Sequence, residues 1–263
     1  MTAGPEAPPP VRRLLVWRHG RTEWNAEGRF QGQLDPPLDH EGRAQAARTA
    51  PHLAAALATG DTVLVSSDLQ RAADTAGALA PLLGVPVRID ERLREHGLGS
   101  WEGLTRDEVA EHHPGQYEDW LAGRAVPGRG GEAQADVVTR ALAAVADLPP
   151  AGVAVLVTHG GTAGRLVEAL LGLGPEHKRI FGPLGNCHWS ELSFQASAWR
   201  LMRHNVSVPA PGRPDGGTRP AGDRGPFPGP SASDAPDAPD APRSGATPEE
   251  APPAPAEDAD AAG

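Results

Sequence analysis

Short apolar runs and helical apolar spacings alternate along the first two hundred residues of the chain. The apolar runs predict strands at 12–17, 62–66, 85–89, 153–158, 186–194 and 197–203. The helical spacings and capping patterns predict helices at 40–58, 68–83, 105–113, 116–122, 134–148 and 163–171. This alternation predicts an α/β three-layer sandwich, with a mostly parallel sheet and helices on both of its faces. The uninterrupted apolar run at 153–157 fits a strand that is buried on both faces.

Polar residues and glycine mark the expected ends of these helices. Asp39 and Asp68 are expected to cap the helices that follow them. Gly84 is expected to end the helix that reaches residue 83. Thr105 and Glu108 have the spacing of a capping box, which predicts a short helix there.

Composition changes sharply near residue 207. The chain has 29 prolines in 263 residues, and from Pro209 onward it consists mainly of Pro, Ala, Gly and Asp, with Phe227 as the one large apolar residue. Such a segment buries too little surface to offset the entropy of ordering it. We therefore predict a disordered N-terminus at 1–11, a folded domain at 12–206 and a disordered tail at 207–263.

Charge and cysteine content indicate which classes of partner and which cellular compartment to expect. The net charge is −10, and the tail from Pro209 has ten acidic residues against four arginines, which leaves about −4 for the rest. No basic segment favours nucleic acid, no apolar run is long enough to span a membrane, and the first ten residues lack the apolar core of a signal peptide. The single cysteine, Cys187, fits a reducing compartment. We expect a cytoplasmic protein, and a homodimer stays open.

Charged side chains and histidines follow four of the predicted strands. Arg18 and His19 follow the first strand, Arg71 the second, Glu95 the third, and His159 the strand at 153–158. In parallel sheets such residues meet at one edge, where ligands bind. Together they suit phosphoryl transfer: an imidazole attacks phosphorus, guanidiniums hold the phosphate, and a carboxylic acid protonates the leaving oxygen.

Other phosphate and metal chemistries lack their motifs. The one lysine, Lys178, lies between His177 and Arg179, so the Gly-Lys-Ser/Thr of a P-loop is absent. The histidines show no metal-binding spacing such as His-Glu-x-x-His. We therefore expect neither a metal nor a cofactor.

An octapeptide and several distant motifs occur in a recognisable order. Residues 18–25 read Arg-His-Gly-Arg-Thr-Glu-Trp-Asn, and further motifs lie at 31–35, 66–72, 93–95, 99–103 and 158–161. With these motifs the chain resembles the histidine phosphatase superfamily over residues 12–206. The resemblance implies a metal-independent phosphatase that acts on a small-molecule phosphomonoester.

The resemblance also implies a role for each matching residue. His19 would be the phosphorylated nucleophile, and Glu95 the general acid and then the base. The residues expected to contact the substrate are Arg18, Thr22, Asn25, Gln31, Arg71, His159 and Gly160. His19 must attack as a neutral imidazole, which nearby guanidiniums favour, and Glu95 must start protonated, which an approaching phosphate dianion favours.

Further motif comparisons separate the members of the family. In mutases, the segment between the acid and the second histidine is longer than the 64 positions that separate Glu95 from His159 here. Mutases also have a Tyr-Gly-x-Leu-Gln-Gly stretch near the acid, where this chain has the different sequence of Leu98–Gly103. The motifs are most similar to those of glucosyl-3-phosphoglycerate phosphatases. One departure is Gly131-Glu132-Ala133, where family members usually have Gly-Glu-Ser. A cofactor-dependent phosphoglycerate mutase and a non-catalytic phospholigand-binding module stay open as alternatives.

Overall fold

The computed structural model describes residues 8–57, 61–174, 177 and 180–210. Of the two segments predicted to be disordered, residues 1–7 and 211–263 lie outside this described part. The first strand already begins at Val11, one residue before the predicted domain boundary.

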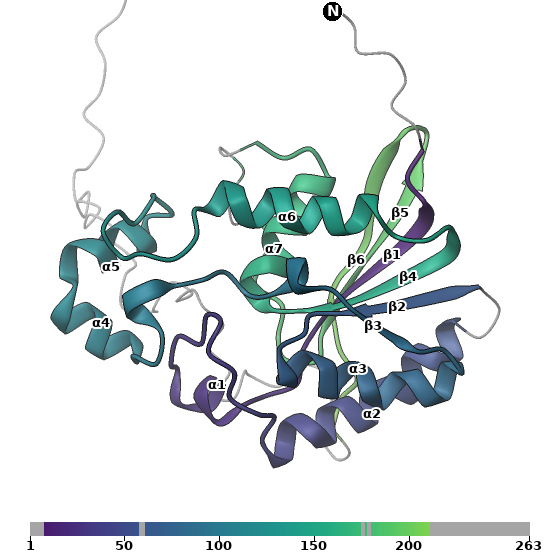
Figure 1. The fold of residues 1–263 in the computed structure, drawn as a ribbon, viewed down its shortest axis with the longest axis horizontal. Helices are drawn as coiled ribbons and strands as arrows, with labels where there is room; N and C mark the ends of the chain where they lie inside the picture. The colour runs from purple at the N-terminus through teal and green to yellow at the C-terminus, as the bar shows by residue number, and fades with distance from the viewer. Residues whose placement is uncertain (1–7, 58–60, 175–176, 178–179, 211–263) are drawn as a thin grey trace, which may run out of the picture. The chain divides into compact units, whose positions relative to one another are not determined.

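A mixed sheet of six strands forms the centre of the described fold (Figure 1). The strands are β1 (Val11–Arg18), β2 (Thr62–Ser66), β3 (Val87–Ile89), β4 (Ala151–Thr158), β5 (Trp189–Gln195) and β6 (Ala198–Val206). Their spatial order is β3-β2-β4-β1-β5-β6. The first four strands pair in parallel, whereas β5 and β6 add an antiparallel hairpin at one side. The prediction of a mostly parallel α/β sheet is confirmed.

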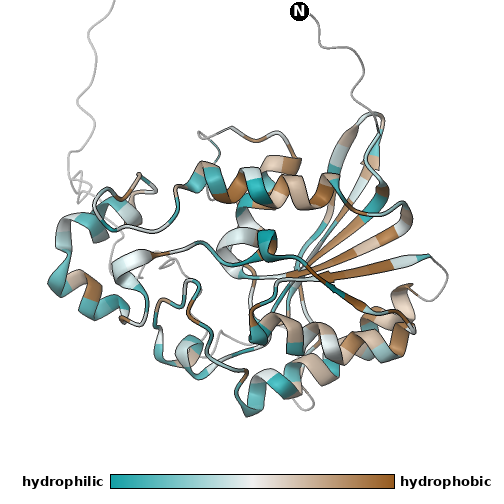
Figure 2. Ribbon diagram, in the orientation of Figure 1, coloured by the Kyte–Doolittle hydropathy of each residue, from teal (hydrophilic) through white to brown (hydrophobic). Residues whose placement is uncertain are grey.

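Helices cover both faces of this sheet, as the sequence pattern predicts. The four helices are α2 (His40–Leu57), α3 (Gln70–Leu83), α6 (Gln134–Ala146) and α7 (Gly160–Leu170). Leu14 and Val16 of β1 face α6 and α7, whereas Leu15 and Trp17 face α2 and α3. Figure 2 shows the apolar strands between these two helical layers. Successive β1 side chains point to opposite faces, so one apolar run supplies both cores.

Shorter elements complete the fold. They are α1 (Glu23–Glu27), α4 (Arg106–His112), α5 (Pro114–Leu121) and the 3₁₀ turns η1 (Glu91–Leu93), whose Leu93 joins the core on the α6 and α7 side, and η2 (Gly99–Trp101), which forms a satellite cluster with α4 and α5. Phe30, Trp101, Val109 and Trp120 pack together there, with the Phe30 and Trp120 rings edge to face at a centroid distance of 5.3 Å. The tryptophans therefore serve as packing residues for the segment that carries α4 and α5.

Most of the predicted helix ends are confirmed. Asp39 accepts a hydrogen bond from the Gly42 amide at 2.6 Å, at the start of α2. Thr105 and Glu108 form the expected capping box of α4. Gly84 ends α3 with a left-handed φ of 67°. Local side chain to backbone bonds therefore set these boundaries, as the sequence motifs indicate.

The predicted cap of α3 is wrong. Asp68 does not bond the first turn; its carboxylate instead forms a bidentate pair with Arg94, with Nε to Oδ1 at 2.8 Å. The Gln70 amide donates to Asp35 Oδ2 at 2.9 Å, so a distant loop supplies the cap. A guanidinium brought close by the fold competes for Asp68 more strongly than neutral amides do.

The parallel strands end at one common edge. Arg18 of β1 pairs with Thr158 of β4, and Ser66 of β2 pairs with Val157. The His19 amide still donates to the Thr158 carbonyl at 3.0 Å, so the chain stays in register for one residue beyond β1. This edge is where the predicted site residues leave the sheet.

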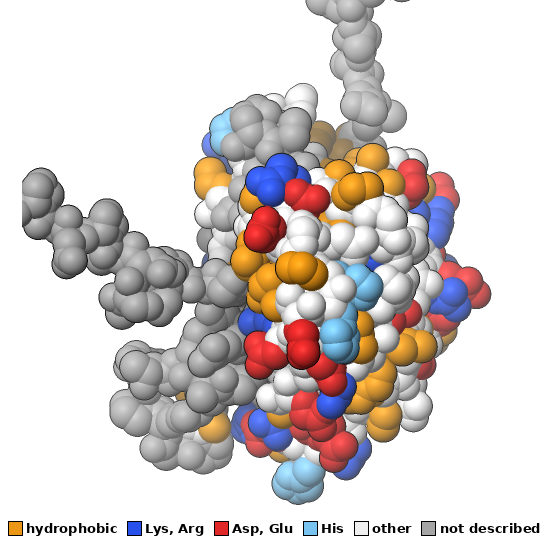
Figure 3. Space-filling model, turned by 90° about the vertical axis from the view of Figure 1, so that its left-hand side faces the viewer, with side chains coloured by type: hydrophobic (Ala, Val, Ile, Leu, Met, Phe, Trp, Pro, Cys, Tyr) orange, Lys and Arg blue, Asp and Glu red, His pale blue; other side chains and the backbone are white. Residues whose placement is uncertain are grey.

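The surface charges and the helices bear on which kinds of partner the protein can have. On the face drawn in Figure 3, acidic and basic side chains lie interspersed. Within the described ranges, none of the helices has both the length and the apolar character that crossing a bilayer requires.

Candidate active site

The five predicted catalytic residues converge at the common edge of β1, β2 and β4. The His19 and His159 rings lie 5.1 Å apart between centroids, and Arg71 Nε lies 3.2 Å from His159 Nδ1. Arg18, His19, Arg71 and Glu95 line one cavity, which we call the phosphate pocket. Residues from four separate strand ends therefore meet, as the strand order requires.

His19 is held in the tautomer that a nucleophile needs. Its Nδ1 lies 2.7 Å from the carbonyl oxygen of Gly20. A carbonyl can only accept, so Nδ1 carries the proton and Nε2 keeps its lone pair. The ring is 3% exposed; burial lowers its pKa well below the usual value, and the charges of Arg71 and Arg18 lower it further. The imidazole is therefore neutral at neutral pH.

The loop that carries His19 is fixed by close packing. The Gly20 amide donates to Thr75 Oγ1 at 3.0 Å, and the Thr75 hydroxyl donates to the Arg71 carbonyl at 2.7 Å. A Cβ atom at Gly20 would lie 2.5 Å from the carbonyl oxygen of Gly42. The third residue of the Arg-His-Gly motif must therefore be glycine to let α2 approach the loop.

Arg71 is held rigidly by its surroundings. Nη1 donates to the Leu34 carbonyl at 2.6 Å, and Nη2 donates to the Gly32 carbonyl at 2.8 Å. The residue is 1% exposed, and burial lowers its pKa to about 10, so it stays charged at neutral pH. Nη1 also faces Asp35 Oδ1 at 3.5 Å, whereas Nη2 has a second hydrogen that can bind a phosphate oxygen.

His159 lies behind Arg71 rather than on the cavity wall. Its Nδ1 accepts from Arg71 Nε at 3.2 Å, so its Nε2 carries the proton and donates to Ser67 Oγ at 3.0 Å. Burial lowers the pKa of this imidazole well below the usual value, and the charges of Arg71 and Arg18 add to that effect. In this structure His159 orients Arg71, and its predicted contact with phosphate stays a prediction.

Arg18 packs tightly against the start of α7. Its Nη1 donates to the Leu184 carbonyl at 2.6 Å. A Cβ atom at Gly160 would lie 3.3 Å from Arg18 Nε, so a larger residue would crowd the guanidinium. Gly160 therefore lines the phosphate pocket beside Arg18.

The Glu95 side chain lies at the N-terminus of α7 and bonds its first amides. Its Oε2 accepts from the Gly161 amide at 2.9 Å, and its Oε1 accepts from the Thr162 and His96 amides at 3.0 and 2.8 Å. Burial opposes ionisation, but the Gly161 and His96 amides and the charge of Arg165 outweigh it and lower the Glu95 pKa. The free protein therefore holds a carboxylate here, whereas the predicted first step needs a protonated acid.

The remaining predicted substrate contacts divide into two groups. Asn25 and Gln31 line the phosphate pocket, and the Oε1 atom of Gln31 is buried without a described hydrogen-bond partner. Thr22 instead forms a capping box with Asn25 at the start of α1. Asn25 Oδ1 also accepts from Asn186 Nδ2 at 3.1 Å. Thr22 thus holds Asn25 in place, and its own phosphate contact stays a prediction.

Sequence reasoning missed several residues that support the site. Asn186 bonds both Asn25 and the His19 carbonyl, the latter at 3.2 Å. Arg140 of α6 donates to the Arg94 and Glu95 carbonyls at 2.7 and 3.0 Å. Arg140 belongs to no recognised motif, and the contacts that Asn186 makes with residues far away in the sequence could not be predicted from its position in the chain.

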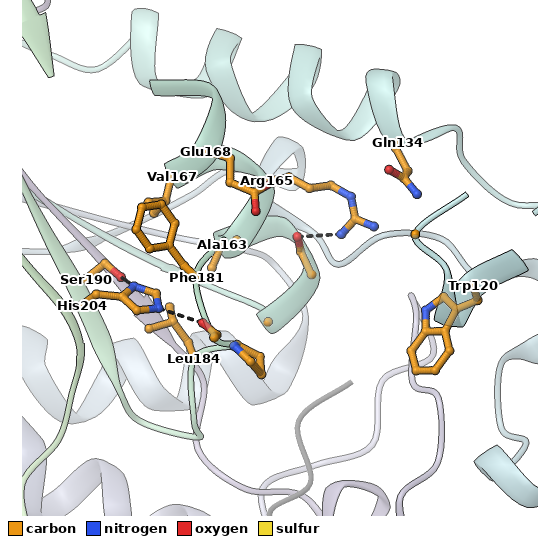
Figure 4. Close-up of a pocket in the computed structure, with 16 residues that line it drawn as sticks. Trp120, Gln134, Ala163, Arg165, Val167, Glu168, Phe181, Leu184, Ser190 and His204 are labelled. Atoms are coloured by element: carbon orange, nitrogen blue, oxygen red, sulfur yellow. Dashed lines mark hydrogen bonds between the residues drawn. The ribbon is translucent and has the colours of Figure 1, made fainter. Parts of the chain in front are cut away.

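Further cavities continue from the phosphate pocket along α7. One lies between α7 and the loop at 125–134, and it shares Glu95 with the phosphate pocket. Another lies behind α7, where Phe181, Leu184 and His204 form its wall (Figure 4). Among the described residues, no group of three or more His, Cys, Asp or Glu side chains is placed to hold a metal ion.

Comparison with known proteins agrees with this geometry. Residues 14–207 match the histidine phosphatase superfamily, branch 1. A glucosyl-3-phosphoglycerate phosphatase from Mycolicibacterium vanbaalenii is 44% identical over 219 residues, which cover 75% of this chain and 96% of that protein. A probable phosphoglycerate mutase from Cronobacter sakazakii is 40% identical over 192 residues, covering 71% of this chain and 87% of that protein.

A solved structure gives the same result. The mycobacterial glucosyl-3-phosphoglycerate phosphatase in complex with VO3 has a TM-score of 0.67 and 40% sequence identity, and the match covers 74% of this chain and all of that one. The predictions of a histidine phosphatase fold and of a phosphatase are confirmed. The chain belongs to the histidine phosphatase superfamily.

Proposed function

We propose that this protein hydrolyses a small phosphomonoester through a phosphohistidine at His19, and that glucosyl-3-phosphoglycerate is its natural substrate. The observation that carries the mechanism is the bond from His19 Nδ1 to the Gly20 carbonyl. It leaves the Nε2 lone pair as the nucleophile, on a neutral ring, in a cavity that also presents Arg18 and Arg71. The choice of substrate is supported by the 44% identical relative of that name.

In the first step, His19 Nε2 attacks phosphorus and the ester P–O bond breaks. Arg18 and Arg71 bind the equatorial oxygens, whose charge they offset without having to move. Glu95 gives its proton to the ester oxygen, which leaves as an alcohol. The negative charge of the incoming phosphate raises the pKa of the nearby Glu95 carboxyl, so Glu95 is protonated when the substrate is bound.

In the second step, Glu95 has the form that the free structure shows. As a carboxylate, held by the Gly161 and Thr162 amides, it takes a proton from water. The water oxygen attacks phosphorus and the P–N bond breaks, which releases inorganic phosphate and neutral His19. After phosphate has left, the Gly161 and His96 amides again lower the pKa of Glu95. Glu95 therefore loses this proton and returns to the carboxylate of the free protein.

Trapping the phosphoenzyme tests this mechanism. Denaturing the protein during turnover of ³²P-labelled substrate should leave acid-labile phosphate on His19. His19→Ala should abolish both label and turnover, whereas the control His112→Ala, exposed on α4, should keep both. Activity should persist in excess EDTA. Label on another residue would refute the mechanism.

Product analysis separates the alternatives. With 3-phosphoglycerate, a phosphatase releases inorganic phosphate, whereas a mutase returns 2-phosphoglycerate. Glucosyl-3-phosphoglycerate should show the highest kcat/KM in a panel of phosphorylated metabolites. No hydrolysis of any panel member or of p-nitrophenyl phosphate between pH 5 and 8 would favour a non-catalytic binding module.

A further inference from the structure

A turn at 31–34 holds Arg71 with its backbone. The Leu34 amide donates to the Gln31 carbonyl at 3.1 Å, which closes the turn. The carbonyls of Gly32 and Leu34 accept from the two terminal nitrogens of Arg71, at 2.8 and 2.6 Å. Two successive carbonyl groups of one turn, with a single residue between them, therefore fix this guanidinium.

The residue between those carbonyls is Gln33, whose side chain reaches the segment that carries Glu95. Its Nε2 donates to the Glu95 carbonyl at 3.2 Å and to Glu132 Oε2 at 3.1 Å. A primary amide nitrogen has two hydrogens, so both are used. Glu132 Oε2 also accepts from the Gly97 amide at 2.8 Å. Gln33 is thus bonded to Glu95 directly and, through Glu132, to the chain two residues further on.

Arg140 of α6 is bonded to the same two acceptors. Its Nη2 donates to the Glu95 carbonyl at 3.0 Å and to Glu132 Oε2 at 2.9 Å. Arg140 therefore ties the Glu95 backbone to α6. Of these two donors, only Gln33 belongs to the turn that holds Arg71, so its side chain is the direct link between the turn and the Glu95 backbone.

The two ends of this link act on one phosphate in the proposed mechanism. Arg71 binds the equatorial oxygens while Glu95 must reach the ester oxygen. A displacement of about 1 Å between such groups can cost on the order of 100-fold in rate. The Gly161 and Thr162 amides tie the Glu95 carboxylate to α7, whereas Gln33 ties the backbone of the same residue to the turn at Arg71.

We propose that Gln33 is a positioning residue, which holds Glu95 at the correct place relative to Arg71 for proton transfer to the ester oxygen and from water. This inference rests on the proposed function, because it needs Glu95 as the acid and the base. Gln33 is not among the described residues that line the phosphate pocket. Its loss should therefore impair proton transfer and spare phosphate binding.

Gln33→Met removes the side-chain link and leaves the turn in place. The Gln33 amide still donates to Glu102 Oε1 at 3.1 Å, and Glu102 Oε1 also accepts from the Leu98 amide at 2.8 Å. The bonds to Arg71 come from backbone carbonyls, which the substitution does not change. Methionine is unbranched and flexible, so it can fill the space of the glutamine side chain.

Two esters with different leaving groups separate proton transfer from phosphate binding. An alkyl ester such as 3-phosphoglycerate needs a proton on its leaving oxygen, whereas p-nitrophenolate leaves as a stable anion. Gln33→Met should lower kcat/KM for 3-phosphoglycerate roughly 10- to 100-fold, and that for p-nitrophenyl phosphate less than about threefold. The inhibition constant of inorganic phosphate should stay that of the wild type.

The second step gives an independent signature in the same variant. The value of kcat/KM reports events up to the departure of the alcohol, whereas kcat also includes hydrolysis of the phosphohistidine, for which Glu95 is the base. With p-nitrophenyl phosphate, Gln33→Met should therefore lower kcat at nearly unchanged kcat/KM. It should also show a burst of p-nitrophenolate and accumulate acid-labile phosphate on the protein.

Gln33→Glu tests the hydrogen bonds themselves. As a carboxylate the new side chain cannot donate and faces Glu132, whereas as a carboxylic acid it has one O–H donor. The ratio of its kcat/KM for 3-phosphoglycerate to that of the wild type should therefore rise as the pH falls from 7.5 to 5. A flat ratio would overturn the inference, also where Gln33→Met does not fold.

The matched control is Gln195→Met. Gln195 is exposed, donates to Ser193 Oγ at 3.1 Å, and lies beyond the pairing of Ser193 with Arg13, at the end of the sheet away from the site. This variant should match the wild type on both esters. An equal loss on both esters in Gln33→Met, or weaker inhibition by inorganic phosphate, would mean that Gln33 only holds the fold or Arg71, and would overturn the inference. A wild type that hydrolyses neither ester would refute the proposed function itself.

Discussion

Lowering the pH from 7.5 to 5.5 should destabilise the fold through its buried histidines. His19, His96 and His159 are each at most 5% exposed. Burial is the main cause that lowers the pKa of all three, to about 4 for His96 and well below the usual value for the other two. The unfolded chain, with ordinary imidazoles of pKa about 6.5, takes up protons over this interval while the folded chain does not.

The sign and the size follow from proton linkage. Because the unfolded state binds more protons, stability is fully present above pH 6.5 and is lost as the pH falls toward the folded pKa values. Each group loses about 1.4 kcal/mol between pH 7.5 and 5.5, so the three together lose about 4 kcal/mol. The free energy of unfolding of a typical domain is about 5–15 kcal/mol, so this loss is a large part of it.

Urea denaturation at constant ionic strength measures this loss directly. The midpoint should fall with pH while the slope m stays constant. His96→Gln should reduce the loss by about one third, whereas His112→Gln, at an exposed position of α4, should leave it unchanged. A free energy of unfolding that changes by less than about 1 kcal/mol over this range would refute the assignment of neutral buried imidazoles.

Three further predictions concern residues around the site. Arg140→Met should cost roughly 3 kcal/mol in urea melts, between the values for exposed and buried pairs, because three carbonyls and the Glu132 carboxylate lose their donor; a cost below about 0.5 kcal/mol would contradict this. Ala133→Ser should raise Tm by roughly 2–4 °C, since α6 lacks a side-chain cap; an unchanged or lower Tm would contradict it. Gly20→Ala should lower kcat on the order of 100-fold, because its Cβ would lie 2.5 Å from the Gly42 carbonyl oxygen; full activity would show that the loop can move.

The local pattern of the sequence determined the layers and most helix ends. Successive apolar residues in β1 supply both cores, and Asp39 and Thr105 cap their helices as their spacing indicates. The convergence of His19, Arg71 and His159 also follows, because parallel strands end at one edge and these residues come directly after such ends. The sequence predicts these features because they depend only on residues close in sequence or on the direction of the strands in the sheet.

Only the tertiary structure decided which partner each polar group takes. Asp68 had the spacing of a cap but pairs with Arg94, and Asp35 from a distant loop takes its place. The tautomer of His19 depends on one carbonyl, and the ionisation of Glu95 depends on amides at the start of α7 that bond its carboxylate. Hydrogen bonds and charges act over a few ångströms in space, so residues far apart in sequence compete for the same group, and their competition is resolved only when the chain has folded.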